Sequence, residues 1–280
     1  MSAPEELRSE MPPQKQIEIR ALHTVAEFEA CVELQKAVWG FGDADLVPVR
    51  MFVVAHKIGG QIFGAFDAAA PDGVIGYALA LPGDRHGHLY LHSHMLAVAA
   101  EYRNTGVGRQ LKLRQRDDAL RRGIELMEWT FDPLEIKNAY FNLERLGAIT
   151  RRYVPNQYGI TSSHLHAGLP TDRLVAEWWM NARRVHAALA GGGPAPDQVT
   201  ERVVVPAAVA AWKTAGDPRA EAVQSQNREA LQQAFARGLT VLGYEKTADG
   251  GGAFRLGRWD EAFSYGPPPA DEPARPQPIS

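Results

Sequence analysis

The chain has 280 residues, enough to bury a full core and to hold one large or two modest domains. Its net charge of −3, without a basic tail, argues against nucleic acid as a partner, and its single cysteine, Cys31, excludes an internal disulfide and a thiolate metal cluster. No apolar run approaches the ~20 residues of a membrane span and no apolar signal core opens the sequence, so we expect a cytoplasmic protein without a membrane partner.

The first half of the chain alternates strand and helix signals. Residues 1–15 are proline-rich and poor in large apolar groups, which predicts a disordered lead. Thr24 and Glu27 form a capping box that opens a helix, and Gly40 can close it. In chain order we predict a strand at 17–21, helices at 25–39 and 49–57, strands at 61–66, 74–81 and 89–98, a helix ending before Gly123, a strand at 124–131, a helix from Asp132-Pro133 and a strand before residue 160.

A turn with two glycines lies between the strand that ends at Val98 and an arginine-rich helix. Its sequence is Arg103-Asn104-Thr105-Gly106-Val107-Gly108. A strand, a glycine turn and a helix N-terminus together form an anion cradle of backbone N–H groups. Arg109 and Lys112 in the first turns of the helix oppose its dipole unless an anion is present, so we predict a bound polyphosphate. The P-loop pattern does not fit, because no Lys-Ser/Thr pair follows these glycines. The dinucleotide fingerprint does not fit either, because Leu111 stands where it needs a small residue.

These residues resemble motif A of the GNAT superfamily of acyl-CoA-dependent N-acyltransferases. The resemblance rests on Leu96-Ala97-Val98, Glu101-Tyr102 and Arg103-x-x-Gly106-x-Gly108. It implies an α/β (α+β) GNAT fold over residues 16–160, with a mixed, mostly antiparallel sheet flanked by helices. It also implies acetyl-CoA or another acyl-CoA as co-substrate and no metal. The main chain of Leu96, Ala97 and Val98 would bind the pantetheine arm, and residues 103–108 would bind the phosphates, with Arg103, Arg109 and Lys112 as charge support.

Two histidines are candidates for the base that deprotonates the acceptor amine. By the period of two, His92 and His94 share one strand face with Leu96 and Val98. Histidine titrates near 6.5, close to what a general base needs. By the resemblance, His92 lies six residues before Val98, where some GNAT enzymes have a base glutamate. The alternative is that both histidines are half-buried strand residues without a catalytic role.

The general acid is less defined. Residues 138–148 resemble the family's motif B helix, but Leu143 stands where a tyrosine commonly protonates the leaving thiolate. Tyr140, one turn earlier, or a water molecule would have to replace it. Asn138 and Asn142, four residues apart, share a helix face and would bond the pantetheine amides, unless they are ordinary surface asparagines.

Three further segments, residues 129–134, 138–143 and 151–159, narrow the resemblance. They resemble a bacterial GNAT branch with a C-terminal extension, whose members have been linked to N-acylation, including N-succinylation, of amino acids. We therefore expect an N-acyltransferase that moves an acetyl or succinyl group to a small-molecule amine, with an amino acid as the favoured acceptor. The loop 39–45 would form the acceptor wall, and Arg151 or Arg152 would bind a carboxylate. The alternatives are a protein-lysine acyltransferase and a non-catalytic acyl-CoA-binding module. The oligomeric state stays open, and a homodimer is compatible with the sequence.

The second half of the chain carries no catalytic motif. We predict a strand at 174–179, a helix after Asp217-Pro218, and a hairpin of strands at 240–244 and 253–256. The apolar strand 174–179 would not stay exposed, so we expect residues 161–262 to pack on the core and to help enclose the acceptor pocket. The proline-rich tail 263–280 is predicted to be disordered.

Overall fold

A single continuous sheet organises the molecule. The computed structural model describes residues 17–68, 73–85, 87–159, 168–192 and 199–259, and within them the sheet has ten strands in the order β1-β2-β3-β4-β5-β7-β6-β9-β10-β8. The pairing of β4 with β5 is parallel and the others are antiparallel, which is the mixed, mostly antiparallel sheet that we predicted. The lead at 1–15, the tail at 263–280 and the boundary at 160–161 lie outside the described residues.

The first half has the predicted order of elements. These are β1 (Ile17–Ala21), α1 (Val25–Trp39), α2 (Val49–Lys57), β2 (Gln61–Asp67), β3 (Gly76–Arg85), β4 (His88–Val98), α3 (Val107–Arg121), β5 (Leu126–Phe131), α4 (Ile136–Tyr140) and β6 (Ile149–Val154). The capping box of Thr24 and Glu27 is present, and Gly40 ends α1 in the left-handed conformation, with a φ of 63°. Gly123, just after α3, is also left-handed. The structure thus confirms the predicted start of α1 and the predicted ends of α1 and α3.

The helix predicted from Asp132 begins four residues later. Asp132 Oδ1 accepts the Leu134 N–H at 2.8 Å, which closes a tight turn before α4. After Tyr140 the helix widens into a π-helical turn, Phe141–Arg145. A side chain that bonds its own backbone two residues on competes with helix formation, and this explains the delayed start.

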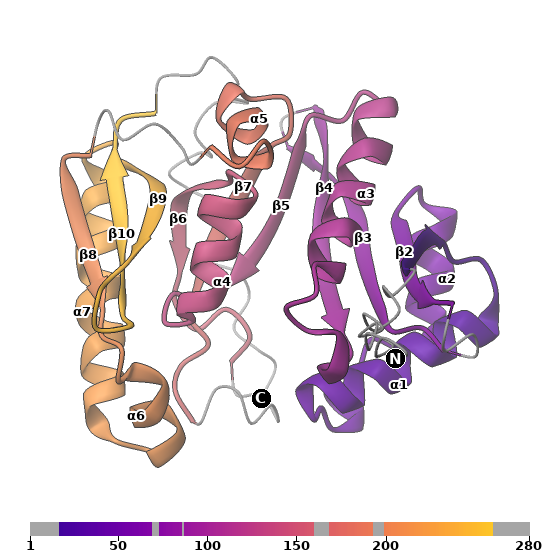
Figure 1. The fold of residues 1–280 in the computed structure, drawn as a ribbon, viewed down its shortest axis with the longest axis horizontal. Coiled ribbons are helices and arrows are strands. Elements are labelled where there is room, and N and C mark those ends of the chain that lie inside the picture. The colour runs from indigo at the N-terminus through magenta and orange to yellow at the C-terminus, as the bar shows by residue number, and fades with distance from the viewer. Residues whose placement is uncertain (1–16, 69–72, 86, 160–167, 193–198, 260–280) are drawn as a thin grey trace, which may run out of the picture.

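Helices cover both faces of the sheet (Figure 1). On one face, Val107 and Leu111 of α3 pack against Ala78 and the neighbouring strands. On the other face α1 and α2 pack against Tyr77, Leu79, Met95 and Ala97, and Cys31 of α1 is buried in this cluster as a free thiol. The sheet is thus buried on both sides around β3 and β4.

The second half adds strands to the same sheet. Its elements are β7 (Arg173–Trp179), α5 (Arg183–Leu189), β8 (Glu201–Val205), α6 (Val209–Ala215), α7 (Pro218–Ala236), β9 (Thr240–Lys246) and β10 (Gly252–Gly257). The predicted strand, helix and hairpin are present, whereas α5, β8 and α6 were not predicted. Strand β7 pairs with β5 along six residues and with β6 on its other edge, so it lies inside the sheet.

Polar contacts also join the two halves. Arg184 of α5 donates to the carbonyls of Gly147 and Leu242, and Glu144 accepts the Tyr244 N–H at 2.6 Å. One apolar cluster includes residues from β5, β7, β9 and β10. These contacts support the prediction that residues 161–262 pack on the core, which the truncation experiment in the Discussion tests.

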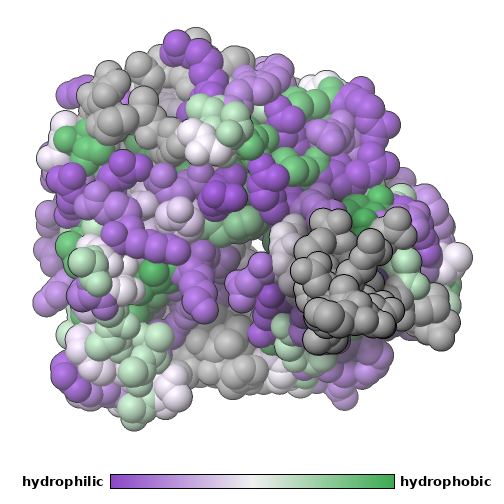
Figure 2. All heavy atoms as spheres, viewed as in Figure 1, coloured by the Kyte–Doolittle hydropathy of each residue, from purple (hydrophilic) through white to green (hydrophobic). Residues whose placement is uncertain are grey.

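The surface drawn in Figure 2 mixes hydrophilic residues with small groups of apolar ones. In the part of the chain that the structure describes, no helix is both long and apolar enough to cross a membrane.

Candidate active site

The two-glycine turn forms the N-terminus of α3. Gly106 is the N-cap residue with a φ of 93°, and no side chain caps this helix end. The first intrahelical bond runs from the Gln110 N–H to the Gly106 carbonyl, so the N–H groups of residues 107–109 have no helical acceptor. A Cβ on Gly106 would meet no atom within 4 Å, so the space before the turn is open. This helix end can bind an anion with its backbone.

The remaining turn residues fix the shape of the cradle. Asn104 takes a left-handed conformation with a φ of 64°. The Thr105 hydroxyl donates to the Tyr102 carbonyl at 2.7 Å, and Arg103 Nε donates to the Val98 carbonyl at 3.3 Å. The Thr105 hydroxyl hydrogen is therefore used inside the turn, whereas the main-chain N–H groups at the start of α3 can donate to a ligand.

Strands β4 and β5 separate soon after they meet. They pair at Leu91 with Met127 and at His92 with Glu128, and the ladder ends there. Toward its C-terminal end, β4 therefore has no β5 partner along Leu96, Ala97 and Val98. Their main-chain polar groups on this edge are available to a ligand that lies between the strands, as the predicted pantetheine contact requires.

A β-bulge interrupts β4 at His94. Leu79 of β3 pairs with Met95, and the next residue, Ala80, pairs with Ser93, so His94 is an extra residue without a partner. Bulges add local twist and re-aim side chains, and they are frequent next to active sites. This bulge lies where β4 leaves β5.

The bulge corrects the predicted strand face. By their partners on β3, His92 lies on the face of Met95 and Ala97, whereas Ser93 lies on the face of Leu96 and Val98. The expectation that both histidines share a face with Leu96 and Val98 is wrong for His92, because the extra residue at His94 reverses the alternation.

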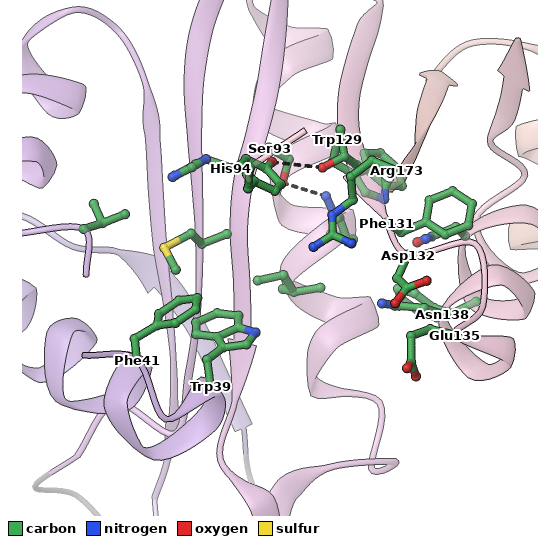
Figure 3. A pocket seen from close by; sticks show the side chains of 18 of the residues that line it. Trp39, Phe41, Ser93, His94, Trp129, Phe131, Asp132, Glu135, Asn138 and Arg173 are labelled. Carbon is green, nitrogen blue, oxygen red and sulfur yellow. Dashed lines mark hydrogen bonds between the residues drawn. The ribbon is translucent and has the colours of Figure 1, made fainter. Parts of the chain in front are cut away.

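A cavity of about 520 Å³ opens between the separated strands. Figure 3 shows Ser93 of β4 next to Trp129 of β5, the His94 ring directed away from β5, and Trp39 and Phe41 at one end. Its lining is Trp39, Phe41, Asp45, Val47, Ser93, His94, Met95, Leu96, Lys112, Trp129, Thr130, Phe131, Asp132, Glu135, Asn138, Phe141, Asn142, Tyr158 and Arg173. A cavity of this size is in the range that small-molecule sites occupy.

One of the two predicted histidines reaches the cavity. His94 lines it, and the desolvation that the cavity wall imposes lowers the pKa of its imidazole, although much of the side chain is solvent-accessible. His92 is half-buried and is not among the lining residues, and its ring centroid lies 6.3 Å from that of His94. A direct base role therefore fits the placement of His94 better than that of His92.

Lys112 lies inside the protein instead of at the phosphate cradle. It is 2% exposed, lines the cavity, and donates from Nζ to Ser93 Oγ at 2.7 Å. The Nζ atom lies 3.8 Å from the ring centroid of Trp129. Burial lowers the pKa of the Lys112 amine to about 7. The predicted charge support for the phosphates is thus wrong for Lys112, because its position on α3 points it at the sheet.

Arg109 has a second role that the sequence did not indicate. Its Nη2 donates to the Leu189 carbonyl at the end of α5, at 2.9 Å. This bond ties the first turn of α3 to the second half of the chain, so only part of the guanidinium can serve a phosphate.

A lysine from the second half holds two carboxylates at the cavity. Lys213 of α6 contacts Asp132 Oδ2 at 2.8 Å and Glu135 Oε1 at 2.9 Å. Burial works against the charge on Lys213, but the two carboxylates raise its pKa overall. Asp132 and Glu135 are therefore fixed as an ion-paired wall next to Asn138 (Figure 3).

The motif B residues divide into two groups. Asn138 and Asn142 both line the cavity, where their amides can bond a pantetheine arm. Tyr140 is not a lining residue, and the Lys246 ammonium lies 4.1 Å from its ring centroid. The structure thus does not bring Tyr140 to the cavity, because that side of α4 packs against β9, and Leu143 is buried in the core.

The two strand arginines bind internal carboxylates instead of a ligand. Arg151 Nη2 lies 2.6 Å from Glu177 Oε2, and Arg152 pairs with Glu128. Because β5 and β7 pair in register, Glu128 and Glu177 are neighbours and hold both arginines. The arginine that does line the cavity is Arg173 of β7.

Sequence reasoning missed several lining or supporting residues, among them Lys112 in this role, Tyr158, Arg173 and Lys213. For Lys112 a signal existed, since the buried positions of α3 include Leu111, Lys112 and Gln115, and polar residues on an apolar stripe indicate a buried polar site. Tyr158, in the turn after β6, has its hydroxyl 3.1 Å from Thr130 Oγ1, and Arg173 lies on β7, which pairs with β5 only in the folded sheet. Among the described residues, no group of three or more His, Cys, Asp or Glu side chains could hold a metal ion.

Comparisons with known proteins give similar structures. The complex of NatC with a Gag peptide and CoA is 18% identical, with 58% of this chain and 97% of that chain covered and a TM-score of 0.46. The ribosomal-protein-S18-alanine N-acetyltransferase from Escherichia coli is 15% identical, with 60% and 96% covered and a TM-score of 0.47. An aminoglycoside 6'-acetyltransferase type Ii is 17% identical, with 59% and 99% covered and a TM-score of 0.46. No curated protein matches the sequence significantly.

The family model gives the assignment. The model of the acetyltransferase (GNAT) family matches residues 28–147, from α1 to the end of the π-helical turn. This range includes the glycine turn, the bulged β4 and the strand β5 from which it separates. The chain therefore contains an acetyltransferase domain of the GNAT family.

Proposed function

We propose that the protein transfers an acyl group, acetyl or succinyl, from an acyl-CoA thioester to the amine of a small molecule, with an amino acid as the acceptor. The observation that carries the proposal is the cavity between β4 and β5, because a carboxylate, Asp45, and a guanidinium, Arg173, both line it. An amino acid presents the matching ammonium and carboxylate.

The chain's residues fit an acyl-CoA. The open backbone N–H groups at the start of α3 suit the pyrophosphate, and the unpaired edge of β4 suits the amides of a pantetheine arm. Asn138 and Asn142 on the facing helix supply further donors and acceptors. A β4 backbone N–H, from Leu96 or Val98, would stabilise the oxyanion of the tetrahedral intermediate, which is worth about 3 kcal/mol.

The walls of the cavity favour a small acceptor over a protein. Trp39 and Phe41 stack with their ring centroids 5.5 Å apart, and they close the α1 side. Arg173 comes from the second half of the chain, and Lys213 from the same half fixes Asp132 and Glu135. Such a wall leaves less room for a peptide strand than an open groove would.

Thiol release tests the proposal. The protein is incubated with acetyl-CoA or succinyl-CoA and a panel of amino acids, and free CoA is measured. We expect release that depends on one class of amino acid and saturates with it. Release that requires a lysine-containing peptide would support a protein-lysine acyltransferase instead. Acyl-CoA binding by calorimetry without any release would support a non-catalytic module.

A further inference from the structure

Lys112 is a buried amine that faces the proposed reaction cavity. It lies on α3 at the point where β4 and β5 begin to separate, and it is 2% exposed. Lysine is almost never fully buried unless an opposite charge compensates it. Such a residue in a cavity therefore needs a chemical explanation.

No carboxylate provides that compensation within the described chain. The contacts of Nζ are Ser93 Oγ at 2.7 Å, Met127 Sδ at 4.0 Å and the face of Trp129 (Figure 3 shows Ser93 and Trp129). A charged ammonium would have one neutral oxygen and a π face in place of its water shell. Desolvation therefore favours the neutral amine and brings the pKa down to about 7.

A hydrogen-bond chain fixes the amine. Lys112 Nζ donates to Ser93 Oγ, and Ser93 Oγ donates to Gln115 Oε1 at 3.1 Å. With the Ser93 hydrogen directed at Gln115, the nitrogen lone pair of a neutral Lys112 is not used by Ser93. Gln115 itself is buried on the same helix, so the chain of donors is rigid. The lone pair is the one group of Lys112 left to accept a proton.

We propose that Lys112 is the proton acceptor of the transfer reaction, taking a proton from the acceptor's ammonium group directly or through one water molecule. This inference rests on the proposed function. The ammonium loses one proton to Lys112 Nζ, and the resulting amine attacks the thioester carbonyl and forms the C–N bond. The C–S bond then breaks, the CoA thiolate takes the second nitrogen proton, and Lys112 releases its proton to solvent.

Other titratable groups face the same cavity from every surrounding element. They are Asp45 before α2, His94 on β4, Asp132 and Glu135 before α4, Tyr158 after β6 and Arg173 on β7. Asp132 and Glu135 are held by Lys213. His94 is the competing base, but its side chain is exposed, whereas Lys112 is buried in the cavity wall and fixed by its bond to Ser93. A neutral amine that titrates near the working pH is better matched to an amine substrate.

The first test compares Lys112→Met with Arg114→Met. Both changes replace a basic side chain of α3 with methionine, but Arg114 points to Phe63, away from the cavity. We expect Lys112→Met to lower kcat about 100-fold or more while the Kd for acetyl-CoA changes less than threefold, and Arg114→Met to leave both near wild type. In wild type, kcat should rise with pH through an apparent pKa of about 7, because the base must be neutral. In Lys112→Met this rise of kcat with pH should be absent.

A second measurement distinguishes a catalytic role of the Lys112 amine from a purely structural role. Lys112→Cys treated with bromoethylamine carries an amine of nearly the same length, and it should recover a large part of kcat, which alkylation with an uncharged reagent should not do. NMR of ¹³C-labelled lysines should show one side chain that titrates near pH 7 and is missing from Lys112→Met.

Three results would overturn the inference. Lys112→Met with more than a third of wild-type kcat would refute it while leaving the proposed function intact. A Lys112 signal that titrates above pH 9 would refute its premise without any assay of activity. If wild type releases no thiol with any acceptor, the proposed function and the inference both fail.

Discussion

Replacing Gly106 with alanine tests the phosphate cradle. The φ of 93° is strained for a side chain, and the Cβ would enter the open space before the helix end, where no protein atom lies within 4 Å. The left-handed conformation costs about 1–2 kcal/mol, which lowers Tm by a few degrees. If the methyl group blocks one charge-assisted hydrogen bond to a phosphate oxygen, binding loses about 1.5–3 kcal/mol, or roughly 10- to 150-fold in Kd.

Gly123→Ala is the matched control. Gly123 lies at the other end of α3, is left-handed with a φ of 71°, and its added Cβ would also meet nothing within 4 Å. Both variants should therefore lose similar stability, but only Gly106→Ala should lose affinity for CoA. Calorimetry with CoA and thermal melts on both proteins measure this. Equal CoA affinity in the two variants would refute the cradle as the phosphate site.

Three further predictions follow from the cavity and the sheet. The Lys112 amine is neutral in the folded protein above about pH 7, but it is protonated up to about pH 10 in the unfolded chain, so the unfolded state binds one more proton. The free energy of unfolding of wild type should therefore rise relative to that of Lys112→Met by about 1.4 kcal/mol per pH unit between pH 7 and 9. Denaturant melts that show a constant difference between the two proteins over this range would contradict the prediction. Asp45→Asn should raise KM for the amino acid about tenfold and leave the Kd of acyl-CoA unchanged. A change in the Kd of acyl-CoA alone would show that Asp45 does not bind the acceptor. Truncation after residue 165 removes β7 from between β5 and β6 and should give an insoluble or inactive fragment, whereas a soluble, monodisperse and fully active fragment would show that the second half is dispensable.

Local sequence signals predicted much of the fold. The capping box at Thr24, the stop at Gly123 and the turn around Gly106 each depend on a few neighbouring residues, and the structure has all three. The short elements α5, β8 and α6 were not predicted. Strand β8 is stabilised by β10, about fifty residues later in the chain, and a short segment with a distant partner gives a weak local pattern.

The candidate site could be predicted only in part. Family motifs led to the cavity-lining residues Leu96, Asn138 and Asn142, and the strand period of two led to His94. The bulge at His94 could not be predicted, because an inserted residue shows only in the pairing of β4 with β3. The same limit applies to the arginines, whose partners Glu128 and Glu177 become neighbours through the pairing of β5 with β7.

Product analysis tests the central claim most directly. Wild-type protein is incubated with acyl-CoA labelled with ¹³C in the acyl group and with a mixture of amino acids, and the products are separated and weighed by mass spectrometry. The account predicts an N-acyl amino acid that carries the label, formed by wild type and strongly reduced in Lys112→Met. Label that stays on CoA, or that appears on protein lysines and on no free amino acid, would contradict it.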